Sequence, residues 1–409
     1  MEFNPKPSTI MHIDLNSCFT SIEQQANRRL RGRPVAVAAY NSPGGCILAA
    51  SVEAKKLGIK TGMRVKEGRL LCPDLVVLEP DPEKYRFVHL KLKEVVERYT
   101  PAAFPRSIDE FVLDLEGCPA FKLGLFEVAK KLKSDIKREL GEFLTVSIGL
   151  APNRFLAKTA AGLHKPDGLD EINQTNFQEI YRSLTLQELC GIAQNNAARL
   201  AGQGIYTVLD FYQANVDTLK RAFHSIGGYY WYLRLRGWEI DAVEFARRSF
   251  GNSYALPRPL TKPAELLPIL AKLTEKMSFR LRNAGFKARG VGVYINYRSG
   301  NFWHKTRLMS EFLYESGDFF KSAYKILGHA PYREPVRVLA VSCFHLARAE
   351  IVQPDLFGIQ ERKISLANSI DTINAKWGTF ILGPASLLLA KENVKDRIAF
   401  GGVRDLINR

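Results

Sequence analysis

The sequence has 409 residues, and its 58 Lys and Arg against 42 Asp and Glu leave a formal net charge of +16. We therefore expect several domains and a polyanionic partner, although a solubilising basic surface would give the same charge. The six cysteines form no Cys-x-x-Cys pair, no secretory segment opens the chain, and no apolar run approaches the length of a membrane span. These features exclude a cysteine metal site and a membrane protein, and they predict a cytoplasmic location.

The first strand in the chain is short and carries a carboxylate near its end. Ile10–Asn16 reads as an apolar strand that contains Asp14, and a helical pattern through Phe19, Ile22 and Ala26 follows it. We therefore expect Asp14 at a strand end, just before a helix begins.

Two further carboxylates are neighbours in a predicted β-hairpin. Residues 99–116 read as two strands around the turn Ser107–Glu110, in which Asp109 and Glu110 are adjacent. Such a pair alone is usually just solvated, but with Asp14 it brings three carboxylates from two strand ends to one sheet edge. Oxygen clusters of this kind suit Mg²⁺, which also binds water and substrate phosphate. The pattern predicts phosphoryl or nucleotidyl transfer.

A third strand leads towards a lysine in a turn. Residues 144–150 alternate as a strand that runs into Ala151–Lys158, and the turn His164–Gly168 follows the next helix. Lys165 lies in this turn, which contains Pro and Gly. Beside a metal cluster its ammonium group can neutralise a triphosphate, whereas alone such a turn would be ordinary surface.

Together these segments resemble the Y-family translesion DNA polymerases, the lineage of bacterial DNA polymerase IV and the polymerase V catalytic subunit. The resemblance rests on Ile10–Asp14, Ser107–Glu110, Ser147–Lys158 and Lys165–Gly168, which occur in the family's order and at about its spacing. It implies a DNA-directed DNA polymerase that adds deoxynucleotides to a primer 3′-OH, in low-fidelity translesion synthesis during DNA damage tolerance.

The resemblance also implies an α+β multidomain fold shaped as a right-hand polymerase. Its parts would be a ferredoxin-like palm at 1–17 and 81–170, small fingers at 18–80 and a helical thumb at 171–240. An α/β little finger at 246–345 and a C-terminal tail at 346–409 would follow. Within the thumb, Leu189–Leu200 followed by Gly204 fits either a helix-hairpin-helix or a plain structural turn.

Carried over to this sequence, the family's catalytic site holds two Mg²⁺ ions, for which Mn²⁺ can substitute. Asp14 and Asp109 would bridge both ions, and Glu110 would bind the ion that activates the primer 3′-OH. The carbonyl of Leu15 would bind the ion at the triphosphate.

The resemblance further implies a triphosphate site at the start of the first helix. Its residues would be Asn16, Ser17, Cys18, Phe19, Lys55 and Lys165, the first four through backbone N–H groups. Phe19 also matches the steric gate, a ring that leaves no room for a ribose 2′-OH, although its spacing fits a core residue too. Val52 and Lys55 stand where the family often has Tyr and Arg, so we expect a weaker grip on the nucleotide.

The basic excess is concentrated in the second half of the chain. Residues 241–345 carry 17 basic and 8 acidic side chains, and 246–345 read as strand, helix, strand, strand, helix, strand. This pattern resembles the little finger and predicts sequence-independent contact with the backbone of primer–template DNA. The residues assigned to that contact are Arg280, Arg289, Arg298, Lys305 and Arg307.

The last sixty residues carry a different motif. In Ile351–Gly358, a stretch without periodicity, Gln353, Leu356 and Phe357 resemble the peptide with which bacterial polymerases bind the sliding clamp. Beyond it, Asp371–Gly378 reads as a short helix. The predicted partners are thus DNA, deoxynucleoside triphosphates and the clamp, for a monomer that associates with the nucleoid during DNA synthesis.

Three other functions share part of this pattern. A catalytically inactive, polymerase-like accessory protein of a mutasome would lack one or more of the carboxylates, yet all three are present. A palm-fold nucleotidyl cyclase would need neither the basic domain nor the clamp peptide. A purely structural DNA-binding protein would not need the acids, which repel DNA when no metal is bound.

Overall fold

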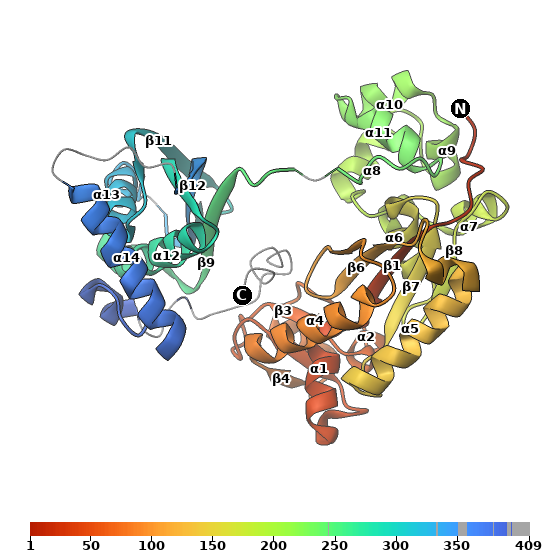
Figure 1. Ribbon diagram of the computed structural model, residues 1–409, viewed down its shortest axis with the longest axis horizontal. Coiled ribbons are helices and arrows are strands. Elements are labelled where there is room, and N and C mark those ends of the chain that lie inside the picture. Colours follow the sequence, from red (N-terminus) through yellow and green to blue (C-terminus); the bar gives the residue numbers. More distant parts are fainter. Residues whose placement is uncertain (244, 333, 351–357, 379, 391–393, 395–409) are drawn as a thin grey trace. The chain divides into compact units, whose positions relative to one another are not determined.

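The chain forms two compact units, Met1–Glu244 and Phe245–Asp396 (Figure 1). The structure is a computed structural model, and it describes residues 1–409 apart from 244, 333, 351–357, 379, 391–393 and 395–409. Among the helices in these described ranges, none combines the length and the apolar character needed to cross a membrane.

The first unit is built around a five-stranded sheet with the order β5-β6-β1-β7-β8. Its strands are β1 (Ile10–Leu15), β5 (Ala103–Pro105), β6 (Glu110–Asp114), β7 (Val146–Ala151) and β8 (Leu169–Glu171). The central strand β1 is antiparallel to both β6 and β7, and β5 and β6 form the predicted hairpin. This topology brings segments about a hundred residues apart in the sequence to neighbouring strands.

Helices cover both faces of this sheet. On one face α4 (Pro82–Glu97) and α5 (Leu125–Leu140) share a core with the apolar residues of β1, such as Ile13. On the other face α6 (Arg154–Leu163) lies so close that a Cβ at Gly149 would be 2.0 Å from the Ala157 carbonyl oxygen. Since strand residues alternate between faces, His12 and Asp14 lie on the face opposite to Ile13.

A small three-stranded sheet follows β1 and the helix α1 (Cys18–Ala26) in the sequence. Its strands are β2 (Val35–Ala38), β3 (Ile47–Ala50) and β4 (Val76–Leu78), in the order β3-β2-β4, with α2 (Val52–Lys56) and α3 (Val65–Leu71) beside them. It has its own small core, in which Ile47, Ile59 and Val65 are fully buried. The one-turn 3₁₀ helix Arg28–Leu30 connects α1 to this sheet.

The last part of the first unit is helical, as predicted for 171–240. The helices are α7 (Phe177–Ser183), α8 (Gln194–Ala201), α9 (Val208–Gln213), α10 (Val216–Phe223) and α11 (Gly227–Arg234). They share a core with α6, in which the rings of Phe155 and Trp231 meet edge to face. Between α7 and α8 the described structure has the 3₁₀ turn Leu186–Glu188, followed by Gly191 with φ of +94°. The element directly before this hairpin is therefore a single 3₁₀ turn rather than a full α-helix.

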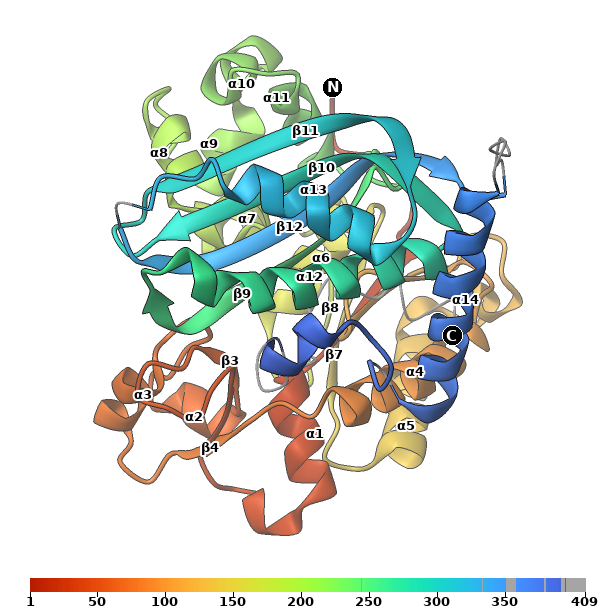
Figure 2. The same cartoon turned by 90° about the vertical axis from the view of Figure 1, so that its left-hand side faces the viewer.

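The second unit follows the order of strands and helices that the sequence predicts. It comprises β9 (Ser249–Leu260), α12 (Pro263–Asn283), β10 (Phe286–Tyr297), β11 (Phe302–Leu313), α13 (Ser316–Leu327) and β12 (Val336–Arg348). The strands form one antiparallel sheet in the order β11-β10-β12-β9. Helices α12 and α13 pack against one face of it, where Val291, Val293 and Ile295 are buried (Figure 2).

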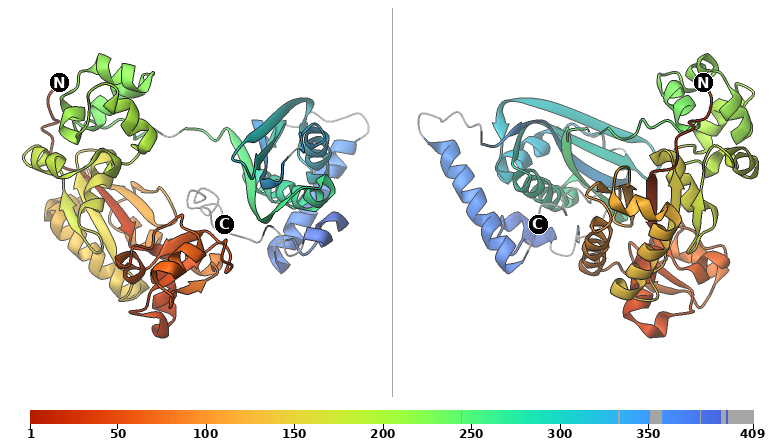
Figure 3. Two further views of the ribbon diagram at one scale, coloured as in Figure 1. Left: turned by 180° about the vertical axis from the view of Figure 1, so that it is seen from behind. Right: turned by 45° about the vertical axis from the view of Figure 1, so that its right-hand side comes forward.

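The C-terminal helix is longer than predicted. The expectation of a short helix at Asp371–Gly378 is wrong at its N-terminal side, because α14 spans Ile359–Trp377 (Figure 3). The helix is anchored to the second unit by charges rather than by an apolar stripe: Arg282, 3 % exposed, donates to both carboxylate oxygens of Asp371 at 2.6 and 2.8 Å. Lys363 adds an ion pair to Asp318 at 2.7 Å. The clamp-motif residues Gln353, Leu356 and Phe357 lie outside the described residues.

Candidate active site

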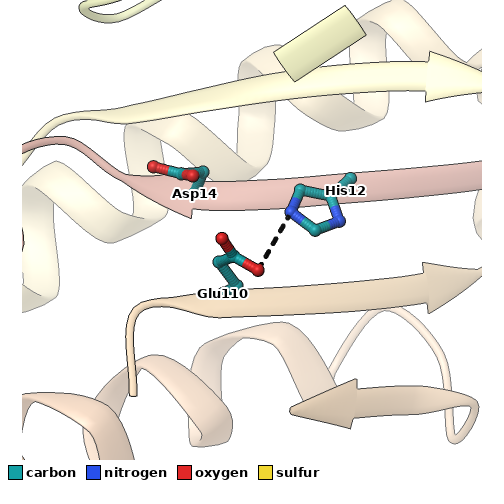
Figure 4. A group of neighbouring side chains, drawn as sticks. All are labelled: His12, Asp14 and Glu110. Atoms are coloured by element: carbon teal, nitrogen blue, oxygen red, sulfur yellow. Dashed lines mark ion pairs between the residues drawn. The ribbon is translucent and has the colours of Figure 1, made fainter. Parts of the chain in front are cut away.

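The predicted carboxylates come together where β1 ends and β6 begins. The strand register pairs Asp14 directly with Glu110, and Asp109 precedes Glu110 in the hairpin turn. One ligand atom from each of His12, Asp14 and Glu110 lies within 4.8 Å of the others (Figure 4). This group of side chains could hold a metal ion, and with Asp109 beside it the site offers mainly the oxygen ligands that hard cations prefer.

Backbone hydrogen bonds fix the turn that carries Asp109. The N–H of Leu15 donates to the Asp109 carbonyl oxygen at 2.9 Å, and the N–H of Arg106 donates to the Glu110 carbonyl oxygen at 2.9 Å. Nδ1 of the buried His89, on α4, lies 2.9 Å from the Ile108 carbonyl oxygen. The Ser107 hydroxyl donates to Oδ1 of Asp109 at 2.5 Å, which orients that carboxylate.

Two lysines pair with two of the three carboxylates. Nζ of Lys165 lies 2.7 Å from Oδ2 of Asp14. Nζ of Lys158, on α6, donates to both oxygens of Glu110 at 2.7 and 2.9 Å. The site therefore holds two positive charges next to the acids that a metal ion would bind.

Burial and mutual repulsion shift the proton affinities of this group. Burial, reinforced by Asp14 and Glu110, raises the pKa of Asp109 to about 6 despite the hydrogen bond from Ser107. Burial also raises the pKa of Asp14, although Lys165 opposes this shift. Burial, together with the nearby cationic side chains of Lys158, Lys165 and Arg106, lowers the pKa of His12 to about 3, so its imidazole is neutral at physiological pH.

A cavity of about 550 Å³ opens beside Asp14 and Asp109. Its lining includes all six residues predicted to bind nucleotide, namely Asn16, Ser17, Cys18, Phe19, Lys55 and Lys165. It also includes Leu15, whose carbonyl was predicted to bind a metal ion, and Val52 from the small sheet's α2. Lys55 reaches across to donate to the Ser17 hydroxyl at 2.8 Å. The volume falls in the range of small-molecule sites.

Asn16 has a different part from the one predicted. Its backbone N–H, assigned to a triphosphate, donates instead to the Thr145 carbonyl oxygen at 2.9 Å. Its side chain accepts from the Asp167 N–H at 2.8 Å and donates to the Ser147 hydroxyl at 2.8 Å. Asn16 thus ties the end of β1 to β7 and to the turn that carries Lys165. Of the four backbone N–H groups expected to bind the triphosphate, those of residues 17–19 remain candidates.

Phe19 lines the cavity and is 1 % exposed. Its ring stacks face to face on Tyr85 of α4, with centroids 4.3 Å apart and an interplanar angle of 8°. The Tyr85 hydroxyl in turn donates to Glu23 at 2.9 Å. Phe19 is therefore both a core residue and part of the cavity wall, so the two interpretations of its spacing are compatible.

The residues predicted to contact DNA differ in their exposure. Arg280 is half-buried and donates to the Gly251 carbonyl oxygen at 2.9 Å, which ties α12 to β9. Arg289, also half-buried, lies over the ring of Phe312. Arg298, Lys305 and Arg307 are exposed, the first in the β10–β11 turn and the other two on the edge strand β11.

Sequence reasoning missed two side chains of the site, His12 and Lys158. His12 precedes Asp14 by two residues, so strand alternation already places both on one face. Lys158 could not be found this way, because its contact with Glu110 depends on how α6 packs across the sheet.

The comparisons with known proteins agree with this geometry. A family model described as the impB/mucB/samB family matches residues 13–162, and the model of that family's C-terminal domain matches residues 247–356. The DNA polymerase IV of Moorella thermoacetica is 33% identical over 381 residues, covering 91% of this chain and 94% of that protein. DNA polymerase IV 1 of Bacillus subtilis is 30% identical over 397 residues, covering 95% of both.

The fold resembles solved polymerase structures as well. The Y-family DNA polymerase chimera Dbh-Dpo4(243-245)-Dbh superimposes with a TM-score of 0.73 at 24% identity, over 83% of this chain and 99% of the chimera. The insertion ternary complex of Dbh DNA polymerase gives a TM-score of 0.57 over 82% of this chain and 98% of that one. The α+β right-hand polymerase fold expected from the sequence is confirmed. The chain belongs to the impB/mucB/samB family, the Y-family translesion DNA polymerases of the DNA polymerase IV lineage.

Proposed function

We propose that this chain is a template-directed DNA polymerase that adds deoxynucleotides to a primer 3′-OH in low-fidelity translesion synthesis. The observation that carries the proposal is the convergence of Asp14, Asp109 and Glu110 with two lysines beside a cavity of about 550 Å³. Asp14 and Asp109, with the Leu15 carbonyl and Glu110, would hold two Mg²⁺ ions, or Mn²⁺ in their place. When bound, such ions activate the primer hydroxyl and stabilise the charge that develops on the leaving pyrophosphate.

The lysines have two positions in this proposal. In the structure, Lys165 pairs with Asp14 and Lys158 pairs with Glu110. With the carboxylates engaged, Lys165 is free to turn towards a triphosphate in the cavity, where Lys55 adds a second positive charge. The backbone at Ser17–Phe19, where α1 begins, supports the same phosphates through the positive end of the helix dipole.

The rigid stack of Phe19 on Tyr85 suits the selection of deoxyribose. Tyr85 is held by Glu23, and both rings are about 1 % exposed, so Phe19 cannot move away from the cavity without leaving its partner. A ribose 2′-OH placed against this ring would clash with it. Phe19 would therefore act as the steric gate of the site.

The remaining parts of the chain would bind and tether DNA. We assign 1–17 with 81–170 to the palm, 18–80 to the fingers, 171–240 to the thumb and 246–345 to the little finger. Of the predicted DNA contacts, the exposed Arg298, Lys305 and Arg307 remain candidates for phosphate binding, whereas Arg280 is engaged with β9.

The tail 346–409 would bind the bacterial sliding clamp through Gln353, Leu356 and Phe357. The chain would then work as a monomer on primer–template DNA at the nucleoid, within the cytoplasm. A clamp tether suits a polymerase whose cavity has Val52 where a phosphate-binding Tyr would grip the nucleotide, since weak gripping favours early dissociation.

An inactive accessory protein and a nucleotidyl cyclase are not favoured. All three carboxylates of the site are present, and the match with the DNA polymerase IV relatives extends over more than nine-tenths of the chain. A cyclase would have no use for the second unit.

Replacing Asp109 with Ala is predicted to abolish nucleotide addition while leaving DNA binding intact, because the change removes a ligand that both ions would share. Single-nucleotide extension of a primed template with Mg²⁺ should slow by at least about 10³-fold. Asp114→Ala, at the far end of the strand β6 that follows Asp109, is the matched control and should extend at nearly the wild-type rate. Near-normal extension by Asp109→Ala would remove this residue from the site.

Replacing Phe19 with Ala is predicted to open space beside the sugar. Incorporation of ribonucleotides relative to deoxyribonucleotides, measured as a ratio of kcat/KM values, should rise about 10–100-fold. Tyr85→Phe keeps the stacked ring and loses only the hydroxyl, so its ratio should stay close to wild type. An unchanged ratio in Phe19→Ala would mean that the ring serves only the core.

Replacing Leu356 and Phe357 together with Ala is predicted to abolish stimulation by the clamp. The loss of buried apolar area should weaken clamp binding by about 2–4 kcal/mol, while extension on bare primer–template stays intact. Leu366→Ala, which changes a leucine that is 60% exposed on α14, is the matched control. Equal clamp stimulation of the double variant and the wild type would exclude this peptide as the tether.

A further inference from the structure

The side chain of His12 has no evident role in the proposed mechanism, although it lies beside the carboxylates. It is 2 % exposed, and neither of its ring nitrogens has a hydrogen-bond partner among the described residues. Its Nε2 lies 3.7 Å from Oε2 of Glu110, and Figure 4 shows the ring directed towards that carboxylate. A buried polar group without a partner costs free energy, so a ligand that satisfies it would be stabilised.

The sheet presents this nitrogen to the same point as two acids. His12 and Asp14 lie two residues apart on one face of β1, and the register places Glu110 opposite Asp14 on β6. On the other side of β1, the residue opposite His12 is Gly149, so no side chain from β7 crowds the ring. The three side chains offer ligand atoms within 4.8 Å of one another.

This donor set differs from the oxygen ligands that Mg²⁺ prefers. An imidazole nitrogen with two carboxylates suits the borderline divalent cations, Zn²⁺ and Co²⁺ among them, which accept nitrogen readily. We propose that His12, Asp14 and Glu110 form a second, inhibitory cation site that binds Zn²⁺-like ions in place of the catalytic arrangement with Asp109. Only the inhibitory consequence rests on the proposed polymerase function; the binding itself does not.

Occupying this site would withdraw Glu110 and Asp14 from the catalytic ions. Lys158 and Lys165 would have to release these carboxylates, as they also must when Mg²⁺ binds. The two modes are mutually exclusive, since both need Asp14 and Glu110. Inhibition by Zn²⁺ should therefore be relieved by raising the Mg²⁺ concentration.

Binding can be measured on the full chain without DNA or nucleotide, by following the visible absorption of added Co²⁺. Wild type should show an absorption band that is lost, or needs at least tenfold more Co²⁺, in both His12→Leu and His12→Gln. His164→Gln changes a histidine of the same unit whose Nδ1 lies 2.6 Å from Oδ1 of Asp170, and this variant should keep the band. Circular dichroism confirms that each variant is folded. A wild-type chain without such a band, or two folded His12 variants that keep it, would overturn the proposal.

Inhibition is measured separately, as the ratio of primer-extension rates with and without Zn²⁺ at a fixed excess of Mg²⁺. The Zn²⁺ concentration that halves this ratio should rise at least tenfold in the His12 variants relative to wild type. Equal sensitivity of wild type and variants would contradict the inhibitory role. Extension in Mg²⁺ alone tests the polymerase function, so failure of that function is distinguishable from failure of this site.

Discussion

The structure depends on holding three carboxylates together in a partly buried site. Asp14 and Glu110 are paired across two strands, with ligand atoms no more than 4.8 Å apart, and Asp109 is next in the chain. Two like charges at that distance repel by roughly 3–4 kcal/mol at an effective dielectric constant of about 20. Such an arrangement survives only with positive charge close by, and here Lys158 and Lys165 supply it.

This requirement explains the architecture around the site. The central position of β1, with antiparallel neighbours on both sides, sets the carboxylates in register. Gly149 lets α6 approach the sheet closely enough for Lys158 to reach Glu110. Asn16 ties the turn that carries Lys165 to the end of β1, so each lysine is held by its own structural device. Lys158 and Lys165 thereby offset the charges of Glu110 and Asp14, two of the three carboxylates, where cations would bind.

Much of this could be predicted from the sequence, because its signals are local. Alternation and turn residues located β1, the hairpin with Asp109 and Glu110, and the order of all six elements of the second unit up to β12. The residues at the start of α1 that were expected to bind nucleotide all line the cavity. What these features share is that each depends on residues close in the chain or on a known spacing.

The features that sequence analysis missed depend on tertiary contacts between segments far apart in the chain. The N–H of Asn16 was assigned to a triphosphate, but it donates to the Thr145 carbonyl oxygen in a tertiary hydrogen bond that no local pattern reveals. The contact of Arg280 with DNA stays a prediction, and its hydrogen bond to the Gly251 carbonyl oxygen was equally hidden from local patterns. The predicted helix at Asp371–Gly378 was too short because α14 has a weak apolar periodicity. The helix docks through the Arg282–Asp371 ion pair, and apolar residues on it such as Leu366 are exposed. Lys158 was missed because its partner lies across a helix–sheet interface.

The central claim is that Lys158 and Lys165 compete with cations for the carboxylates of the site, since Lys158 pairs with Glu110 and Lys165 with Asp14. Its most direct test is a calorimetric titration of Mg²⁺ into the full chain without DNA or nucleotide, comparing wild type with Lys158→Met. Lys130→Met, which breaks an exposed ion pair with Glu127 on α5, is the control. The account predicts that Lys158→Met binds Mg²⁺ about threefold to tenfold more tightly, since an internal competitor worth about 1 kcal/mol is removed. Unchanged or weaker Mg²⁺ binding by Lys158→Met would contradict it.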